Sequence, residues 1–170
     1  AGAAQVNLVV SATALEAAKE LQWRFHTPYV AGVPLQRGAD ALKTALEQAI
    51  RTGENQFPCT LRPKGGTEVT LIGEPVTMGA LGAAIGAAHG TSVRVLCPVE
   101  ADPVLLASKD RMVHGEEEME ELLQNAQIVI ADPLYRAICP AAAQFYELSH
   151  QAFSGRSGWK TMRSLITMEI

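Results

Sequence analysis

The chain has 170 residues, 48% of them hydrophobic, and a formal net charge of −4 from 14 basic and 18 acidic residues. A chain of this size buries about 70% of its unfolded surface, enough for one good core or two smaller cores that share an interface. Basic and acidic residues are interspersed and form no stripe that follows a phosphate backbone, which argues against nucleic acid as a partner. No apolar run reaches the roughly 18 residues that span a bilayer, so we expect no membrane partner either.

The three cysteines are Cys59, Cys97 and Cys139. Their number is odd and they lack a C-x-x-C pair, which argues against a disulfide framework and against a self-contained zinc site. We therefore expect a cytoplasmic protein in which each cysteine acts as a small hydrophobe. Cys139, beside Pro140, is the one for which a further role stays open.

The chain begins at Ala1 without a methionine and enters a strand-like run within a few residues. Either a processing event or an excision placed that start. We expect a domain taken from a longer polypeptide.

Residues 1–62 predict a β-α-β-α unit. The predicted elements are a strand over 6–10, a helix over 14–25, a strand over 28–33 and a helix over 39–51. Ser11 and Thr13 stand before the first helix as capping hydroxyls. Glycine and proline are dense over 52–66, which predicts a linker, and we place a domain boundary near Pro63.

Residues 63–170 predict a second, more regular unit. Its predicted elements are strands over 68–72, 93–97, 127–131 and 145–148, helices over 77–89 and 116–125, a short helical stretch over 139–143, and a closing helix that carries Trp159, Met162, Leu165 and Ile166 at helical spacing. Nearly continuous apolar strands that alternate with helices indicate a parallel sheet covered on both faces. The predicted fold class is α/β, with two Rossmann-like parallel-sheet units in three α/β/α layers.

The turn from Gly73 to Pro75 leads from a strand into a helix, a position where backbone N–H groups can hold an anion. It lacks the G-x-G-x-x-G pattern of dinucleotide sites, so we interpret Gly79, Gly82 and Gly86 as positions that allow close packing of the helix on the sheet. The glutamates within 116–121 predict a solvated helix face rather than a cation site, because Met119, Leu122 and Leu123 define the buried face.

Asp132 follows a buried strand and is open to two interpretations. It caps the turn that follows by accepting backbone N–H bonds, or it forms the wall of a pocket at the carboxyl edge of the sheet. His26, His89 and His114 stand near element ends and are expected at the surface.

The segment from Phe145 to Trp159 places hydroxyl, imidazole and guanidinium groups just beyond a predicted strand. Ser149 and His150 follow the strand directly, and Ser154-Gly155-Arg156 comes next. In open α/β sheets ligands bind at this edge. A role for Ser149 and His150 as simple caps of the strand remains the alternative.

Motifs along the whole chain resemble nitrogenase component 1-like oxidoreductases, the family of the molybdenum-iron protein subunits. Those similar to the middle domain of that family are Val6 to Ser11, Trp23-Arg24-Phe25, Thr27-Pro28-Tyr29 and Pro34 to Gly38. Those similar to its third domain are Ile72 to Pro75, the alanine-rich helix, Val95-Leu96-Cys97, Ile130-Ala131-Asp132 and Ser154-Gly155-Arg156. Their order and spacing carry the resemblance, since each motif alone is common.

The resemblance implies the C-terminal portion of a large subunit, built from Rossmann-like domains, that reduces a bound substrate. The implied partners are an N-terminal domain of the same polypeptide, an ATP-dependent iron–sulfur reductase that donates electrons, and a homologous subunit. The cysteines that ligate the family's iron–sulfur cluster lie mainly in that N-terminal domain. We therefore expect an iron–sulfur cluster in the full-length complex and no cofactor or metal ligand in this portion.

In the molybdenum enzyme a cysteine after the first strand and a histidine after the last hold the active-site metal cluster. The resemblance puts these positions on Ser11 and Ser149, with His150 one place further on. A neutral hydroxyl is a poor ligand for soft iron, and an offset of one residue turns a side chain to the opposite face. The resemblance to the family's tetrapyrrole-reducing members suggests instead a pocket for an organic substrate, with Ser11, Ser149 and His150 as hydrogen-bond donors and Arg156 as an anion partner.

The leading hypothesis is thus a nitrogenase component 1-like oxidoreductase subunit that is not competent as this portion alone. Two alternatives remain: a non-catalytic module that closes two lobes over a metal chelate or small ligand, and an assembly or scaffold subunit that has kept the fold without the chemistry.

Overall fold

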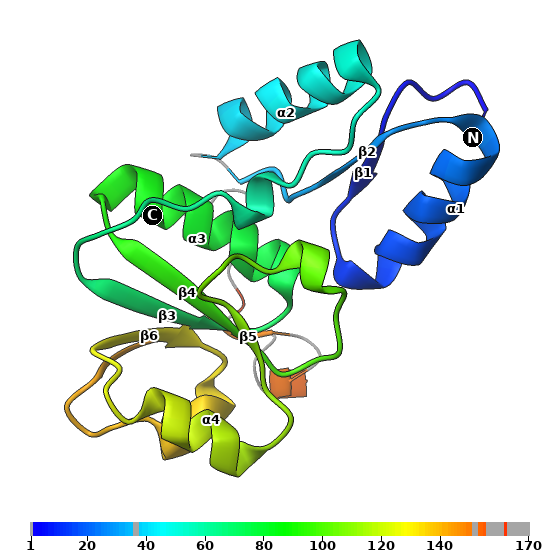
Figure 1. The fold of residues 1–170 in the computed structure, drawn as a ribbon. Coiled ribbons are helices and arrows are strands. Elements are labelled where there is room, and N and C mark those ends of the chain that lie inside the picture. The colour runs from blue at the N-terminus through cyan, green and yellow to red at the C-terminus, as the bar shows by residue number, and fades with distance from the viewer. Residues whose placement is uncertain (1, 36–37, 151–152, 156–161, 163–170) are drawn as a thin grey trace.

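This computed structural model describes residues 2–35, 38–150, 153–155 and 162. The chain is an α/β protein with a two-stranded and a five-stranded parallel sheet, both flanked by helices (Figure 1). The elements, in chain order, are β1 (Asn7–Val9), α1 (Leu15–Phe25), β2 (Tyr29–Ala31), α2 (Ala39–Thr52), η2 (Pro58–Thr60), β3 (Glu68–Ile72), α3 (Pro75–His89), β4 (Ser92–Cys97), η3 (Pro103–Leu105), β5 (Arg111–Met112), α4 (Glu116–Leu123), β6 (Ile128–Ala131), η4 (Pro133–Ile138) and β7 (Gln144–Glu147), with a short 3-10 turn, η1 (Ala12–Ala14), before α1. Within the described residues, no helix combines the length and the apolar character that crossing a bilayer requires.

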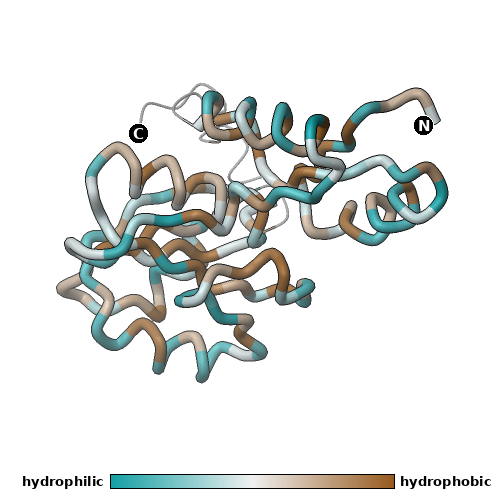
Figure 2. Tube along the Cα trace, turned by 45° about the horizontal axis from the view of Figure 1, so that its top comes forward, coloured by the Kyte–Doolittle hydropathy of each residue, from teal (hydrophilic) through white to brown (hydrophobic). Residues whose placement is uncertain are grey.

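The smaller sheet pairs β1 with β2 and is covered on both faces, because successive side chains of a strand point to opposite sides. Val9 and Ala31 pack with α1, whereas Val30 packs with α2. Figure 2 shows that hydrophilic and hydrophobic residues alternate along α2, as expected for a helix with one buried face. The predicted strands and helices of the first unit are confirmed in kind and order.

The larger sheet has the strand order β5-β4-β3-β6-β7, and all its neighbouring strands are parallel. Counted within this sheet the order is 3-2-1-4-5, which is compatible with a Rossmann-like arrangement. Leu71 of β3 packs under α3, and the next residue, Ile72, packs with Met119 and Leu123 of α4 on the other face. The predicted three-layer arrangement is confirmed for this sheet (Figure 1).

Helix α3 begins two residues earlier than the predicted 77–89. Glu74 is its N-cap, and its carboxylate accepts hydrogen bonds from the backbone N–H groups of Val76 and Thr77. Pro75 occupies the first helical position, where its missing N–H costs nothing and its fixed φ suits the helix. Gly90 ends the helix at a φ of 64°, a conformation that favours glycine.

The segment predicted as a linker, residues 52–66, packs on α3 through its residues 58–63. Cys59 is fully buried, and a Cβ on Gly79 would stand 2.5 Å from its carbonyl oxygen. Arg62 forms a buried ion pair with Asp110, which also accepts the backbone N–H of Val95 at 2.8 Å. The glycines of α3 therefore allow this segment to cross the helix closely, and only Gly82 meets the sheet, through Val93 and Leu71. The domain boundary near Pro63 stays a prediction.

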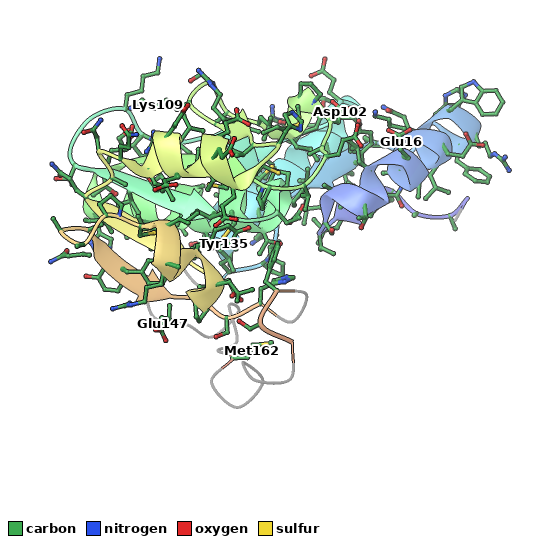
Figure 3. The ribbon with its side chains drawn as sticks, turned by 90° about the horizontal axis from the view of Figure 1, so that it is seen from below. Glu16, Asp102, Lys109, Tyr135, Glu147 and Met162 are labelled. Carbon is green, nitrogen blue, oxygen red and sulfur yellow. The ribbon has the colours of Figure 1, made fainter. Side chains whose placement is uncertain are left out.

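An ion pair also links α1 to the loop that carries η3. Lys19 lies 2.7 Å from Glu16 on its own helix and 2.7 Å from Asp102 on the loop between β4 and β5 (Figure 3). Asp102 in turn accepts the backbone N–H of Val104 and so caps η3. A specific polar contact thus links the first unit to a loop at the end of the larger sheet.

Three further differences from prediction concern short elements. The helical stretch predicted over 139–143 was wrong: the 3-10 helix η4 lies earlier, because Asp132 caps it and Pro133 follows at its first position. The two-residue strand β5 and the turn η3 were not predicted. Trp159, Leu165 and Ile166 of the predicted closing helix lie outside the described residues.

Candidate site at the carboxyl ends of the central strands

The carboxyl ends of β3, β6 and β7 meet around a cavity of about 210 Å³. Its lining is Ile72, Gly73, Glu74, Thr77, Met78, Asp132, Leu148, Ser149, His150, Phe153 and Met162. After β3 the chain adds β4 and β5 on one side of β3, and then β6 and β7 on the other side. The direction in which strands are added therefore reverses between β3 and β6, and the cavity lies at this point. Ligands of open parallel sheets bind at this switch point.

Glu74 fills the position where an anion would sit at the start of α3. Its Oε2 accepts the N–H of Thr77 at 2.8 Å, and its Oε1 accepts the N–H of Val76 at 3.1 Å and that of Ala12 at 2.6 Å. The N–H groups that hold phosphate in nucleotide sites are therefore already bound to the protein's own carboxylate. This geometry opposes phosphate binding at the turn from Gly73 to Pro75.

Asp132 is buried and serves as both cap and pocket wall, so the two interpretations of it hold together. Its carboxylate accepts the N–H of Leu134 at 3.1 Å, the N–H of His150 at 2.8 Å and the hydroxyl of Ser154. Burial acts to raise the pKa of Asp132, but the hydrogen bonds from Ser154, His150 and Leu134 outweigh it and hold the pKa below its usual value. Asp132 is thus an ionised anchor and not a poised acid.

Ser149 and His150 lie on the lining of the cavity, as their predicted role requires. Leu148, one residue before, is buried in the core beneath α3. The carbonyl oxygen of His150 accepts the N–H groups of Phe153 at 3.0 Å and Ser154 at 2.9 Å, which closes a turn. The imidazole of His150 lies 5.5 Å from the ring of Phe153.

Ser11 does not line the cavity. Its hydroxyl lies 3.1 Å from that of Thr13, and the residue after it, Ala12, bonds to Glu74. The structure therefore brings the end of β1 next to the site without placing Ser11 in it. Arg156 lies outside the described residues.

Sequence reasoning missed Thr77 and Phe153 as lining residues and treated Glu74 only as part of a turn. A signal for Glu74 was present, since an acceptor directly before a proline at a strand-to-helix turn is typical of an N-cap. No local signal marks Phe153, because its place depends on the turn that Asp132 holds through Ser154.

The thiols are not poised as ligands. Burial raises the pKa of Cys59 to about 12, and burial also raises the pKa of Cys97 and of Cys139. Cys97 donates to the carbonyl oxygen of Val99 at 3.1 Å. Among the described residues, no group of three or more His, Cys, Asp or Glu side chains is arranged to hold a metal ion. The exposed positions of His26, His89 and His114 agree with prediction.

Comparisons with protein-family models, with curated proteins and with solved structures find no match to this chain.

Proposed function

We propose that this chain is part of a nitrogenase component 1-like oxidoreductase subunit whose cavity at the strand ends binds a small organic substrate. In this proposal the two sheets belong to two Rossmann-like units of that family's type, and an ATP-dependent iron–sulfur reductase supplies the electrons. The observation that carries the proposal is the meeting of Ser149, His150 and Asp132 at the switch point of the larger sheet. The assignment to this family is supported by the order of the motifs along the chain, which resembles that of nitrogenase component 1-like proteins.

The polar groups of the cavity suit a neutral, hydrogen-bonding ligand better than an anion. Thr77, Ser149 and His150 offer hydroxyl and imidazole groups, whereas Glu74 and Asp132 bring negative charge. Ile72, Met78 and Leu148 supply the apolar part of the wall. A mostly apolar wall with a few placed polar groups is typical of small-molecule sites.

The chemistry of the site opposes a nitrogenase-type metal cluster at this position. The positions that correspond to the cluster ligands carry the neutral hydroxyls of Ser11 and Ser149, and Ser11 is not on the lining. Neutral hydroxyls are weak ligands for iron sites that prefer thiolate. The protein's part in a reduction would be to bind and orient the substrate.

The test is the identity of the partners of the native polypeptide. The polypeptide that contains this chain is affinity-tagged in its source cells and purified without oxygen, in the presence of MgATP and aluminium fluoride, which traps ATPases in a transition-state-like complex. We expect a P-loop iron–sulfur ATPase in stoichiometric amount by mass spectrometry, and its loss when ADP alone is supplied. The proposal would be overturned if the tagged polypeptide is recovered without such an ATPase, or if the genes beside its own encode a transport system.

One observation favours a second candidate, a non-catalytic module that binds a metal chelate or small ligand. Both carboxylates at the cavity are held by hydrogen bonds from the protein itself, Glu74 by three and Asp132 by three. Carboxylates that accept hydrogen bonds from the protein in this way shape the cavity wall, but they do not transfer protons to a ligand. This candidate predicts that the cavity binds a ligand and that no ATP-dependent turnover follows. An assembly subunit of the same fold predicts no ligand binding and no turnover.

A further inference from the structure

A second cavity, of about 540 Å³, opens at the carboxyl ends of β4, β5 and β6. Its lining is Pro98, Val99, Glu100, Val113, His114, Gly115, Glu116, Met119, Leu134, Tyr135, Ile138 and Phe153. Phe153 lines both cavities and so separates this one from the site described above. The volume lies within the range of about 300 to 1,000 Å³ that is typical of small-molecule sites.

The floor of this cavity is apolar. Val113 and Met119 are buried beneath it, and Leu134 stays 64% exposed at its side. Two aromatic rings complete the wall: the rings of Tyr135 and Phe153 lie 6.1 Å apart, at an angle of 66°. Tyr135 is half-buried, and Figure 3 shows it near the middle of the molecule as seen from below. An apolar ligand body would find contact on this floor and on the aromatic wall.

The rim of the cavity is acidic. Glu100 and Glu116 are exposed there, and among the described residues the lining contains no lysine or arginine. No ion pair of the described chain involves either glutamate. Glu118 on the same helix is engaged differently, because its carboxylate accepts the N–H of His114 at 2.8 Å. An anionic ligand would therefore meet repulsion at the mouth of this cavity.

We propose that this cavity is a binding site for an organic cation with an apolar body, of the alkylammonium or quaternary ammonium class. Aromatic rings attract such cations through the negative charge above each ring face, and carboxylates at the same cavity add a favourable charge interaction. The apolar body lies on Met119 and Leu134, and the charged head faces Glu100 and Glu116. The proposal rests on this cavity alone and is independent of the function proposed for the neighbouring site.

The aromatic wall is built before any ligand arrives. Ser154, the residue after Phe153, donates its hydroxyl to Asp132 at the end of β6, and the N–H of Phe153 bonds to the carbonyl oxygen of His150. His150 also donates its N–H to Asp132, so residues on both sides of Phe153 are held by one carboxylate at the end of β6. A wall fixed in this way reduces the ordering cost of binding.

The test is an NMR titration of the ¹⁵N- and methyl-labelled 170-residue chain. The probes are benzyltrimethylammonium, neutral benzyl alcohol and anionic phenylacetate, each up to 10 mM. We expect the cation to shift the Met119 methyl and Gly115 amide signals, with a Kd about tenfold below that of the alcohol, and the anion to have no effect. Absence of binding by the cation, equal binding of the alcohol, or shifts that map elsewhere would each overturn the proposal.

The charge contribution is tested with a matched pair of variants. Glu100→Gln with Glu116→Gln removes both rim charges, and we expect at least about fivefold weaker binding of the cation. Glu117→Gln with Glu120→Gln removes two exposed charges of the same helix that do not line the cavity, and we expect unchanged binding. If both pairs weaken binding of the cation equally, the effect comes from the net charge of the protein, and the proposed role of Glu100 and Glu116 at this cavity is wrong. All four positions are exposed, so folding is preserved in each variant.

Discussion

Glu74 and Ala12 join the two parallel sheets of this protein. Oε1 of Glu74, at the end of β3, accepts the backbone N–H of Ala12, just beyond β1, at 2.6 Å. The same carboxylate caps α3 through Val76 and Thr77. One side chain thus fixes the start of a helix, occupies the anion position of the site and holds the end of the smaller sheet against the larger one.

Replacement of Glu74 by alanine should lower the free energy of unfolding by about 2 to 4 kcal/mol, because it removes a helix cap and a charge-assisted hydrogen bond. Glu74→Gln keeps one acceptor oxygen and should cost less. Urea denaturation gives both values, and hydrogen exchange should become faster at the amide of Ala12. Glu47→Ala on the exposed face of α2 is the control, with a change within about 0.5 kcal/mol. Equal losses at positions 74 and 47 would contradict the joining role.

Replacement of Asp132 by asparagine should cost about 2 kcal/mol at neutral pH, since the amide nitrogen cannot accept the bonds from His150 and Ser154. The folded pKa of Asp132 is lowered, so its stabilising contribution is complete above the unfolded pKa of about 4 and is lost as the pH falls through the folded pKa. The stability difference between native chain and variant should be constant from about pH 7 to pH 5 and narrow below about pH 4. Urea denaturation across this range measures it, with the exposed Glu54→Gln as control. A difference that widens in acid would show that the carboxylate is not the stabilising form.

Replacement of Gly79 by alanine should destabilise the chain although alanine favours helices. The new Cβ would stand 2.5 Å from the carbonyl oxygen of Cys59, so the segment over 57–63 must move away from α3. We expect a net loss of about 2 kcal/mol and faster labelling of the Cys59 thiol by a thiol reagent, located by peptide mass spectrometry. Gly115→Ala meets no atom within 4 Å and should change stability by less than about 1 kcal/mol. Unchanged labelling of Cys59 in the Gly79 variant would contradict the close crossing.

The purified chain should be colourless and should hold no stoichiometric iron after anaerobic reconstitution with ferrous iron and sulfide. Among the described residues no group of three or more His, Cys, Asp or Glu side chains is arranged to hold a metal ion, and burial, which raises the pKa of Cys59, Cys97 and Cys139, disfavours the thiolates that iron–sulfur clusters require. Visible absorbance and a colorimetric iron assay test this. A brown protein with about four irons per chain would contradict the prediction.

Sequence patterns were sufficient for elements whose signal is local. The strand-like run E-V-T-L-I over 68–72 predicted β3 to the residue, and the periodicity over 39–51 predicted α2 to within one residue. Apolar strands that alternate with helices also predicted parallel pairing, which the five-stranded sheet confirms. A local pattern suffices here because it encodes which face of an element is apolar.

Features that depend on distant contacts were not accessible in this way. The strand β5 has two residues, too few for any pattern, and exists because Arg111 and Met112 pair with the end of β4. The stretch over 52–66 reads as a linker from its prolines and glycines, yet its residues 58–63 are held on α3 by Cys59 and by the ion pair of Arg62 with Asp110.

The sequence by itself determined the class of the fold and the edge of the sheet where Ser149 and His150 gather, because strand ends and turn residues are marked in the chain. Only the tertiary structure decided that Ser11 stays off the lining, that Glu74 occupies the anion position, and that Phe153 separates two cavities. These relations join residues far apart in the chain, and their geometry is fixed by packing and by hydrogen bonds such as that between Glu74 and Ala12.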